Sequence, residues 1–198
     1  MIKSLFRSIL RLFGWKLEHE SVPDYGKAVL VFAPHTSNWD FVTMLCAKFA
    51  LDVQVRYLGK HTLFRPPIGW FFRALGGIPV ERSENHNMVD QVIEIIEHED
   101  QCLLALSPEG TRSFTHYWKT GFYHIAHRAQ IPIVMFYLDR PSKVIGFAKP
   151  FDTSGDIEAD FVRIADFYAD KEGFIPEYKS VIQTNQTYLK SRNDEEPE

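Results

Sequence analysis

The residues best suited to chemistry are a histidine and a carboxylate five positions apart. His35 and Asp40 follow an apolar run at residues 28–33 that is typical of a buried strand, and an apolar stretch typical of a helix comes next. Across five helical residues two side chains diverge by about 140°, so these two can meet only if the helix begins between them. With Ser37 or Asn38 as the helix cap, Asp40 can hold one ring nitrogen of His35 and leave the other for general-base chemistry.

The same spacing also fits a purely structural role. Ser37-x-x-Asp40 resembles a capping box, in which the carboxylate only satisfies a backbone amide and His35 is an ordinary loop residue. The residues alone leave both interpretations open. Position favours chemistry, because sites in α/β proteins gather at the carboxyl ends of strands.

A second polar segment, residues 107–113, follows another apolar run. It reads Ser-Pro-Glu-Gly-Thr-Arg-Ser, so Glu109, Thr111 and Arg112 surround Gly110, whose missing side chain permits close backbone approach. An acceptor, a hydroxyl and a forked guanidinium around such a turn suit a phosphate-bearing ligand. A solvated polar turn is the structural alternative.

A second arginine follows the short apolar stretch at residues 78–80. Arg82 could add another guanidinium fork for a phosphate. The alternative is an exposed ion pair with the neighbouring Glu81.

Apolar periodicity supplies the elements that must position these groups. It predicts strands and helices that alternate along the chain, which indicates one α/β domain with a mixed β-sheet flanked by helices. The predicted strands are 28–33, 53–58, 78–80, 102–106, 131–138 and 143–148, and the predicted helices are 41–51, 66–75, 88–97, 121–128 and others in the last fifty residues.

Composition narrows the function classes. The chain has 198 residues and a net charge of −4, which argues against a nucleic-acid binder. Cys46 and Cys102 sit in apolar runs and are expected to be free thiols, and His124 and His127 lack the further ligands of a metal site. The apolar runs are too short to span a bilayer.

The first residues form a basic amphipathic pattern. Residues 2–15 predict a helix with Lys3, Arg7 and Arg11 on one face and an apolar stripe on another. Phe6, Phe13 and Trp15 suit a membrane headgroup boundary, but the stripe could equally pack on the protein's own core.

Four segments in order carry a resemblance to a known family: His35-x4-Asp40, residues 76–82, residues 108–112 and residues 131–134. They resemble the four motifs of glycerophospholipid acyltransferases, most nearly the lysophosphatidate (1-acylglycerol-3-phosphate) acyltransferases. Lys60 and Lys119 also stand where the family's pattern continues, so the resemblance spans roughly residues 28–138.

The resemblance implies roles for particular residues. His35 would be the base and Asp40 its orienting partner, while a wider set would bind substrate, namely Lys60, Arg82, Glu109, Gly110, Thr111, Arg112 and Lys119. It also implies a division into a membrane-surface helix at residues 1–17 and an acyltransferase domain at residues 18–192. Residues 193–198 are acidic and are expected to be disordered.

The implied reaction moves a fatty acyl group from acyl-CoA or acyl carrier protein to a hydroxyl of a lysophospholipid. No metal, other cofactor or nucleic acid is expected, and the protein would lie peripherally on the cytoplasmic face of a membrane. A serine hydrolase is a rival class, but the chain has no Gly-x-Ser-x-Gly segment. Two further alternatives are a different lipid acceptor and a non-catalytic lipid-binding relative.

Overall fold

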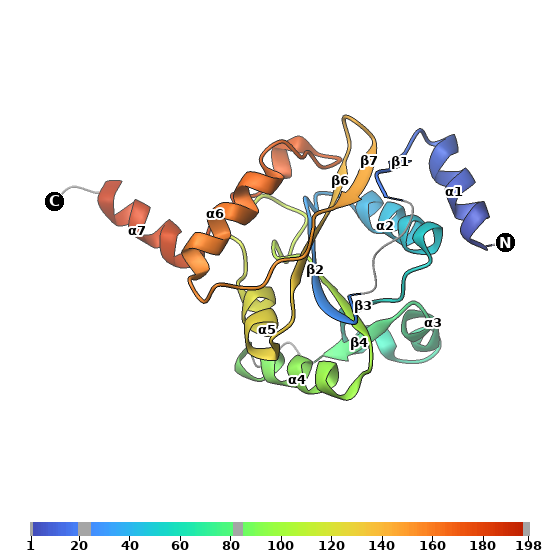
Figure 1. The fold of residues 1–198 in the computed structure, drawn as a ribbon, viewed down its shortest axis with the longest axis horizontal. Helices are drawn as coiled ribbons and strands as arrows, with labels where there is room; N and C mark the ends of the chain where they lie inside the picture. Colours follow the sequence, from blue (N-terminus) through green and yellow to red (C-terminus); the bar gives the residue numbers. More distant parts are fainter. Residues whose placement is uncertain (1, 20–24, 81–84, 196–198) are drawn as a thin grey trace.

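A computed structural model describes residues 2–19, 25–80 and 85–195 and centres on one β-sheet with helices on both faces (Figure 1). The described residues give seven strands in the order β1-β7-β6-β2-β5-β3-β4. Neighbouring strands run parallel except β6 and β7. The strands are β1 Lys16–Leu17, β2 Lys27–Ala33, β3 Val55–Lys60, β4 Gly77–Val80, β5 Cys102–Leu106, β6 Ile133–Asp139 and β7 Val144–Phe147.

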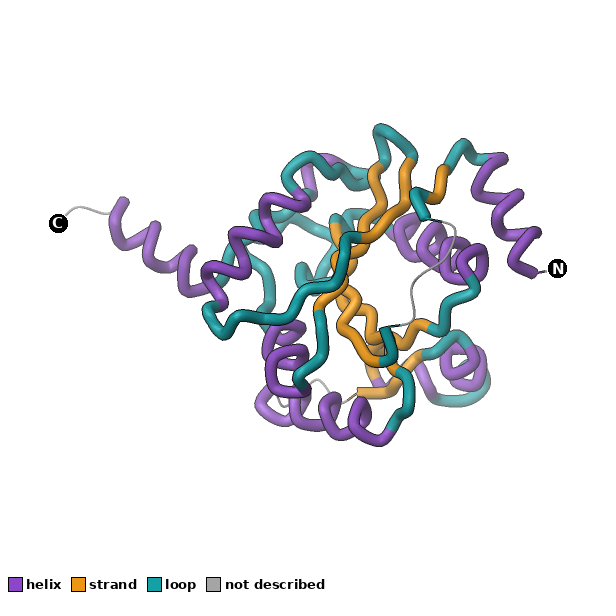
Figure 2. The backbone as a smooth tube through the Cα atoms, in the orientation of Figure 1, coloured by secondary structure: helices purple, strands orange, loops and turns teal. Residues whose placement is uncertain are grey.

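The helices form two layers that bury the sheet between them (Figure 2). On one face lie α1 (Ile2–Leu12) and α2 (Asn38–Leu51), with the short helices η1 (His61–Phe64) and α3 (Gly69–Ala74) over the β3–β4 edge. The other face carries α4 (Asn85–His98), α5 (Gly121–Ala129) and α6 (Ile157–Tyr168). After η2 (Pro176–Tyr178) the chain ends in α7 (Asn185–Glu195), which projects away from the body.

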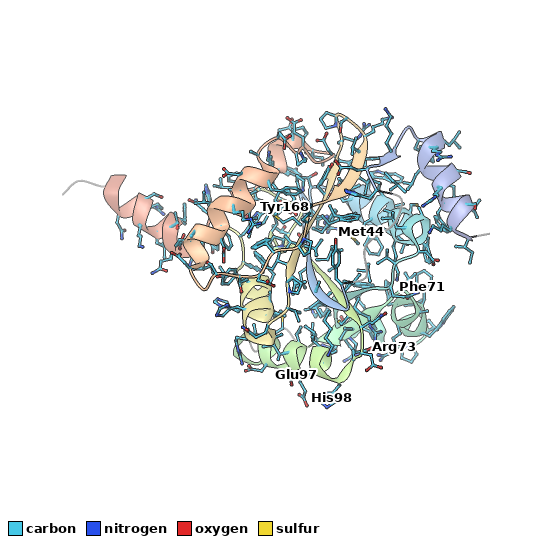
Figure 3. The ribbon with its side chains drawn as sticks, viewed as in Figure 1. Met44, Phe71, Arg73, Glu97, His98 and Tyr168 are labelled. Atoms are coloured by element: carbon cyan, nitrogen blue, oxygen red, sulfur yellow. The ribbon has the colours of Figure 1, made fainter. Side chains whose placement is uncertain are left out.

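The central strand β2 shows why the apolar runs are continuous rather than alternating. After Lys27 every residue of β2 is buried, because helices cover both faces of a parallel sheet. Val29 and Val31 face the α4–α5–α6 layer, whereas Leu30 and Phe32 face α1 and α2. In Figure 3, Tyr168 reaches from α6 toward the sheet, where its hydroxyl bonds the carbonyls of Val31 and Phe136.

The connections open a crevice at the carboxyl ends of β2 and β5. These strands are parallel neighbours. The chain leaves β2 through α2 on one face and leaves β5 through α5 on the other. Loops that depart in opposite directions leave a space between them, the usual ligand position in open α/β sheets.

The fold confirms the predicted class and corrects some boundaries. The strand at residues 102–106 has the predicted bounds, and the sheet is mixed, as expected. The two-residue strand β1 and the short helix η1 were not predicted. Helix α7 runs through Glu195, so residues 193–195, expected to be disordered, are helical; residues 196–198 lie outside the described residues. Cys46 and Cys102 are free.

Helix α1 divides its apolar residues between the core and the surface. It ends at Leu12 rather than at residue 15. Leu10 is buried, Trp15 is buried just after the helix, and Phe6 stacks on Phe49 of α2. Phe6 and Trp15 therefore pack on the protein's own core, which is the second of the two interpretations of the stripe. Ile2, Leu5, Leu12 and Phe13 remain exposed. Within the described residues no helix combines the length and apolarity needed to cross a bilayer.

Candidate active site

The predicted meeting of His35 and Asp40 occurs. Helix α2 begins at Asn38 with Ser37 as its cap, so His35 lies on the incoming loop and Asp40 in the first turn. The Nδ1 atom of His35 is 3.2 Å from Oδ2 of Asp40. Asp40 is fully buried, whereas the side chain of His35 is 22% exposed. One ring nitrogen is thus held from inside while the ring still reaches the surface.

Asp40 closes the start of helix α2 and also faces the ring of His35. Its Oδ2 accepts hydrogen bonds from the amides of Thr36 at 2.6 Å and Ser37 at 2.7 Å. The hydroxyl of Ser37 accepts from the amide of Trp39, which completes a capping box. The two interpretations of the spacing therefore hold together, because one oxygen atom both closes the helix start and faces the imidazole.

Glu109 lies beneath the His35 loop rather than on the open surface. Its Oε2 accepts a hydrogen bond of 2.7 Å from the main-chain amide of His35, and the residue is only 3% exposed. The hydroxyls of Ser107 and Ser180 also bond its carboxyl. Sequence reasoning assigned Glu109 to substrate binding. In the structure its carboxyl contacts the main chain of His35 and is closed off from solvent, and its assignment to substrate binding stays a prediction.

Burial changes the protonation of Glu109. Removal from water raises the pKa of this carboxyl to about 8, against the opposing effect of the His35 amide, and the nearby charge of Asp40 raises it further. A neutral carboxylic acid can accept the His35 amide and avoids placing a second negative charge beside Asp40. Around neutral pH the carboxyl of Glu109 is therefore largely protonated.

The rest of the predicted phosphate-binding turn faces outward next to the catalytic loop. Arg112 is exposed, and its guanidinium bonds the side chain of Asn38 at the start of α2. Gly110 has a φ of +66°, a left-handed conformation that favours glycine. A side chain there would also collide with Lys119, whose Nζ would be 2.8 Å from an added Cβ. Arg112, Gly110 and Lys119 therefore gather at the crevice, and Thr111 is exposed between the first two.

Of the two remaining predicted binding residues, the structure describes only Lys60. Lys60 is the last residue of β3, exposed at the carboxyl end of the strand next to β5. It shares the edge of the sheet on which the crevice opens. Arg82 follows β4 but lies outside the described residues, so its role stays a prediction.

Sequence reasoning missed a segment that supports the site from behind. This C-terminal strap, residues 172–184, contacts both catalytic loops. The hydroxyl of buried Thr36 accepts from the amide of Ile175, and the hydroxyl of Ser180 accepts from the amide of Thr115 while bonding Glu109. Gly173 packs so closely that an added Cβ would be 2.4 Å from Oγ1 of Thr36. No local spacing signals these contacts, because they join residues that are 65 to 139 positions apart.

A family model described as Acyltransferase matches residues 16–138, which is well over half of the chain. The chain belongs to this acyltransferase family. The matched segment contains His35, Asp40 and the turn at residues 108–112, and the strap lies beyond it. The match confirms the resemblance of this sequence to the acyltransferase family.

The fold is also similar to that of a solved acyltransferase. The structure is the 1-acyl-sn-glycerophosphate acyltransferase PlsC from Thermotoga maritima, with a TM-score of 0.57 and 17% sequence identity. The similarity covers 85% of this chain and 74% of that chain. No curated protein sequence matches this acyltransferase significantly. The structural likeness therefore supports the fold, while the family match supports acyl transfer.

Proposed function

We propose that this acyltransferase moves a fatty acyl group from acyl-CoA or acyl carrier protein to the hydroxyl of 1-acylglycerol-3-phosphate. The observation that carries the proposal is the imidazole of His35 held by buried Asp40 beside the exposed Arg112. The named activity of PlsC agrees with this acceptor.

In the proposed reaction, Nε2 of His35 accepts the proton of the acceptor hydroxyl as its oxygen attacks the thioester carbonyl. The C–O bond forms and the carbonyl oxygen becomes an oxyanion, which amides at the start of α2 or near Gly110 would stabilise. Collapse breaks the C–S bond, and the leaving thiolate takes the proton back from His35. No acyl-enzyme is formed.

The fixed geometry of His35 suits a general base rather than a partner for a nucleophilic serine. Ser37 uses its hydroxyl as the helix cap, and the hydroxyl of Ser107 donates to Glu109. Within the part of the chain that the structure describes, the ring of His35 bonds Asp40 and no serine. This arrangement favours direct transfer over hydrolysis through a serine.

A small apolar cavity of about 50 Å³ agrees with a substrate that carries an apolar chain. It lies between α2 and the sheet, and one of its lining residues, Phe41, directly follows Asp40 in the chain. Lys48 also lines the cavity, and its ammonium donates to the carbonyl of Leu75 at 2.6 Å. The walls are otherwise almost wholly apolar, including Leu30, Phe41, Met44, Leu45, Leu51, Val53, Val55, Leu75, Leu103, Phe136 and Phe147.

We also propose that the protein acts peripherally on a membrane, at its cytoplasmic face. The exposed apolar residues of α1, with Arg11 and Lys16 exposed beside them, support attachment through this helix. Replacing exposed Leu12 and Phe13 by Ser should weaken flotation of the full chain with liposomes. Equal flotation would refute α1 as an attachment element.

The deciding experiment is transfer of labelled palmitoyl-CoA to 1-acylglycerol-3-phosphate in detergent micelles. Wild type should form diacyl product, and His35→Ala should lower kcat by orders of magnitude while leaving acceptor binding largely intact. Activity that survives in His35→Ala would overturn the mechanism. Transfer only to other lysolipids would change the acceptor, and tight lysolipid binding without turnover on either donor would indicate a non-catalytic relative.

A further inference from the structure

Away from the catalytic centre, one surface concentrates exposed apolar and basic side chains. Trp70 of α3 is 71% exposed and Ile68, just before the helix, is 56% exposed. Single exposed apolar residues are common on protein surfaces, but a cluster of this kind usually marks an interaction site. The aromatic-basic patch consists of Leu63, Arg65, Ile68, Trp70, Phe71 and Arg73, all of them exposed.

Local packing holds the patch outward. Phe64 is buried, with its ring against Gly59 and Gly77, where an added Cβ would come within 3 Å of that ring. Phe72 makes an edge contact with Phe64, and its carbonyl accepts from the hydroxyl of Tyr57. These inward aromatics fix the segment on β3 and β4. The remaining aromatic side chains of the same segment consequently face solvent.

The charge of this segment runs opposite to that of the whole chain. The protein has a net charge of −4 and 26 acidic residues, yet residues 53–80 contain no Asp or Glu. Arg65 and Arg73 are exposed within the patch, and Lys60 is exposed just before it. Tryptophan and phenylalanine beside exposed cations are the composition of a surface that enters the headgroup region of an anionic bilayer.

The patch also borders the apolar cavity beneath α2. Leu75, directly after α3, lines that cavity together with Tyr57. Figure 1 shows α3 on the same side of the sheet as α1 and α2, and Figure 3 shows Phe71 and Arg73 at the outer rim of that side. A lipid surface in contact with the patch would therefore lie next to the compartment suited to an acyl chain.

We propose that the aromatic-basic patch is a docking surface for anionic lipid bilayers, separate from α1, that brings the acyl cavity against the membrane. The proposal rests on the proposed action on a lipid substrate and adds the surface through which the lipid is reached. An alternative occupant, a second copy of this chain, would bury the same aromatics but would bring exposed arginines on both partners close together.

The test is flotation of full-length protein with phosphatidylcholine vesicles, with or without phosphatidylglycerol. Trp70→Ser/Phe71→Ser should lower vesicle partitioning about tenfold or more on both compositions. Arg65→Gln/Arg73→Gln should lower it severalfold only where phosphatidylglycerol is present, and added salt should reproduce that loss in wild type. Val162→Ser/Leu189→Ser is the matched control, because both residues are exposed apolar positions on α6 and α7.

Transfer in detergent micelles separates this proposal from the proposed function. Every patch variant should keep wild-type micellar activity, and circular dichroism should show an unchanged fold. Unchanged flotation of both patch variants would overturn the docking surface even if transfer is confirmed. If the flotation results are as expected but wild type shows no transfer, the proposed function is overturned and the docking surface is retained.

A wild-type dimer in ultracentrifugation that Trp70→Ser abolishes would assign the patch to a second copy instead. If the aromatic variant unfolds, the arginine variant decides alone.

Discussion

Replacing Glu109 by Gln isolates the effect of its raised pKa. The substitution keeps an oxygen that can accept the His35 amide but removes the ionisable proton. Glu109→Gln should therefore retain activity within severalfold around neutral pH, where the wild-type carboxyl is largely protonated. Glu109→Ala, which removes the acceptor, should lower kcat much further.

The stability of the two proteins should respond differently to pH. The carboxyl of Glu109 has a pKa of about 8 in the fold, against an ordinary 4.5, so the folded state binds this proton more tightly than the unfolded state. Stability that depends on this proton is complete below about pH 4.5 and falls as pH rises toward about 8. The fall is about 1.4 kcal/mol per pH unit and reaches about 5 kcal/mol over the window.

Urea unfolding of wild type and Glu109→Gln across this window measures the difference directly. The free energy of unfolding of wild type, minus that of the variant, should decrease as the pH rises and should level off above about pH 8. Effects of titrating groups that do not interact with Glu109 cancel in this difference. Glu97→Gln, at an exposed position, controls for the loss of a carboxyl group. Parallel profiles for wild type and Glu109→Gln would refute the protonated, buried acid.

Three further predictions test the crevice, the cavity and the strap. Arg112→Ala should raise the acceptor KM roughly tenfold to a hundredfold with little change in kcat, measured by steady-state kinetics; an unchanged KM contradicts phosphate binding. Met44→Trp should lower kcat/KM for palmitoyl-CoA by about tenfold relative to a donor whose chain is two methylenes shorter, because each excluded methylene is worth about 0.8 kcal/mol. An unchanged chain-length preference would show that the cavity does not bind the acyl chain. Gly173→Ala should destabilise the folded protein by about 1–3 kcal/mol in thermal unfolding and should slow transfer in kinetic assays. Gly121→Ala is the control, because an added Cβ there meets open space. Equal stability and activity of the two variants would exclude a role for the contact between the strap and Thr36.

The catalytic pair could be predicted because its geometry is local. The five-residue spacing and the position of the helix cap decide whether His35 and Asp40 meet. Both features can be recognised in the sequence between these two residues. The central strands could be predicted as well, since burial on two faces makes their apolar runs continuous. The end of α1 could not be predicted from this pattern, because Phe13 and Trp15 continue the apolar stripe although the helix ends at Leu12.

The burial of Glu109 and the strap could not be predicted because they depend on distant partners. A glutamate beside Gly110 and Arg112 has the composition of an exposed binding turn. Only the pairing of β2 with β5 brings its carboxyl under the His35 amide, across 74 positions of sequence. The strap contacts through Thr36 and Ser180 have the same origin, since polar residues in a long loop carry no periodic signal.

The two carboxyl groups together explain how the base is held. Asp40 fixes the His35 ring from the helix side, and Glu109 fixes the main chain of the same residue from β5. A histidine bound at one point could still swing with its loop, whereas one bound through both ring and amide keeps Nε2 in a single direction. Because the second attachment crosses from one strand to its neighbour, orientation of the base depends on the register of β2 and β5. The His-x4-Asp loop alone therefore supplies the contact that holds the ring of His35, whereas the contact that holds its main chain comes from Glu109.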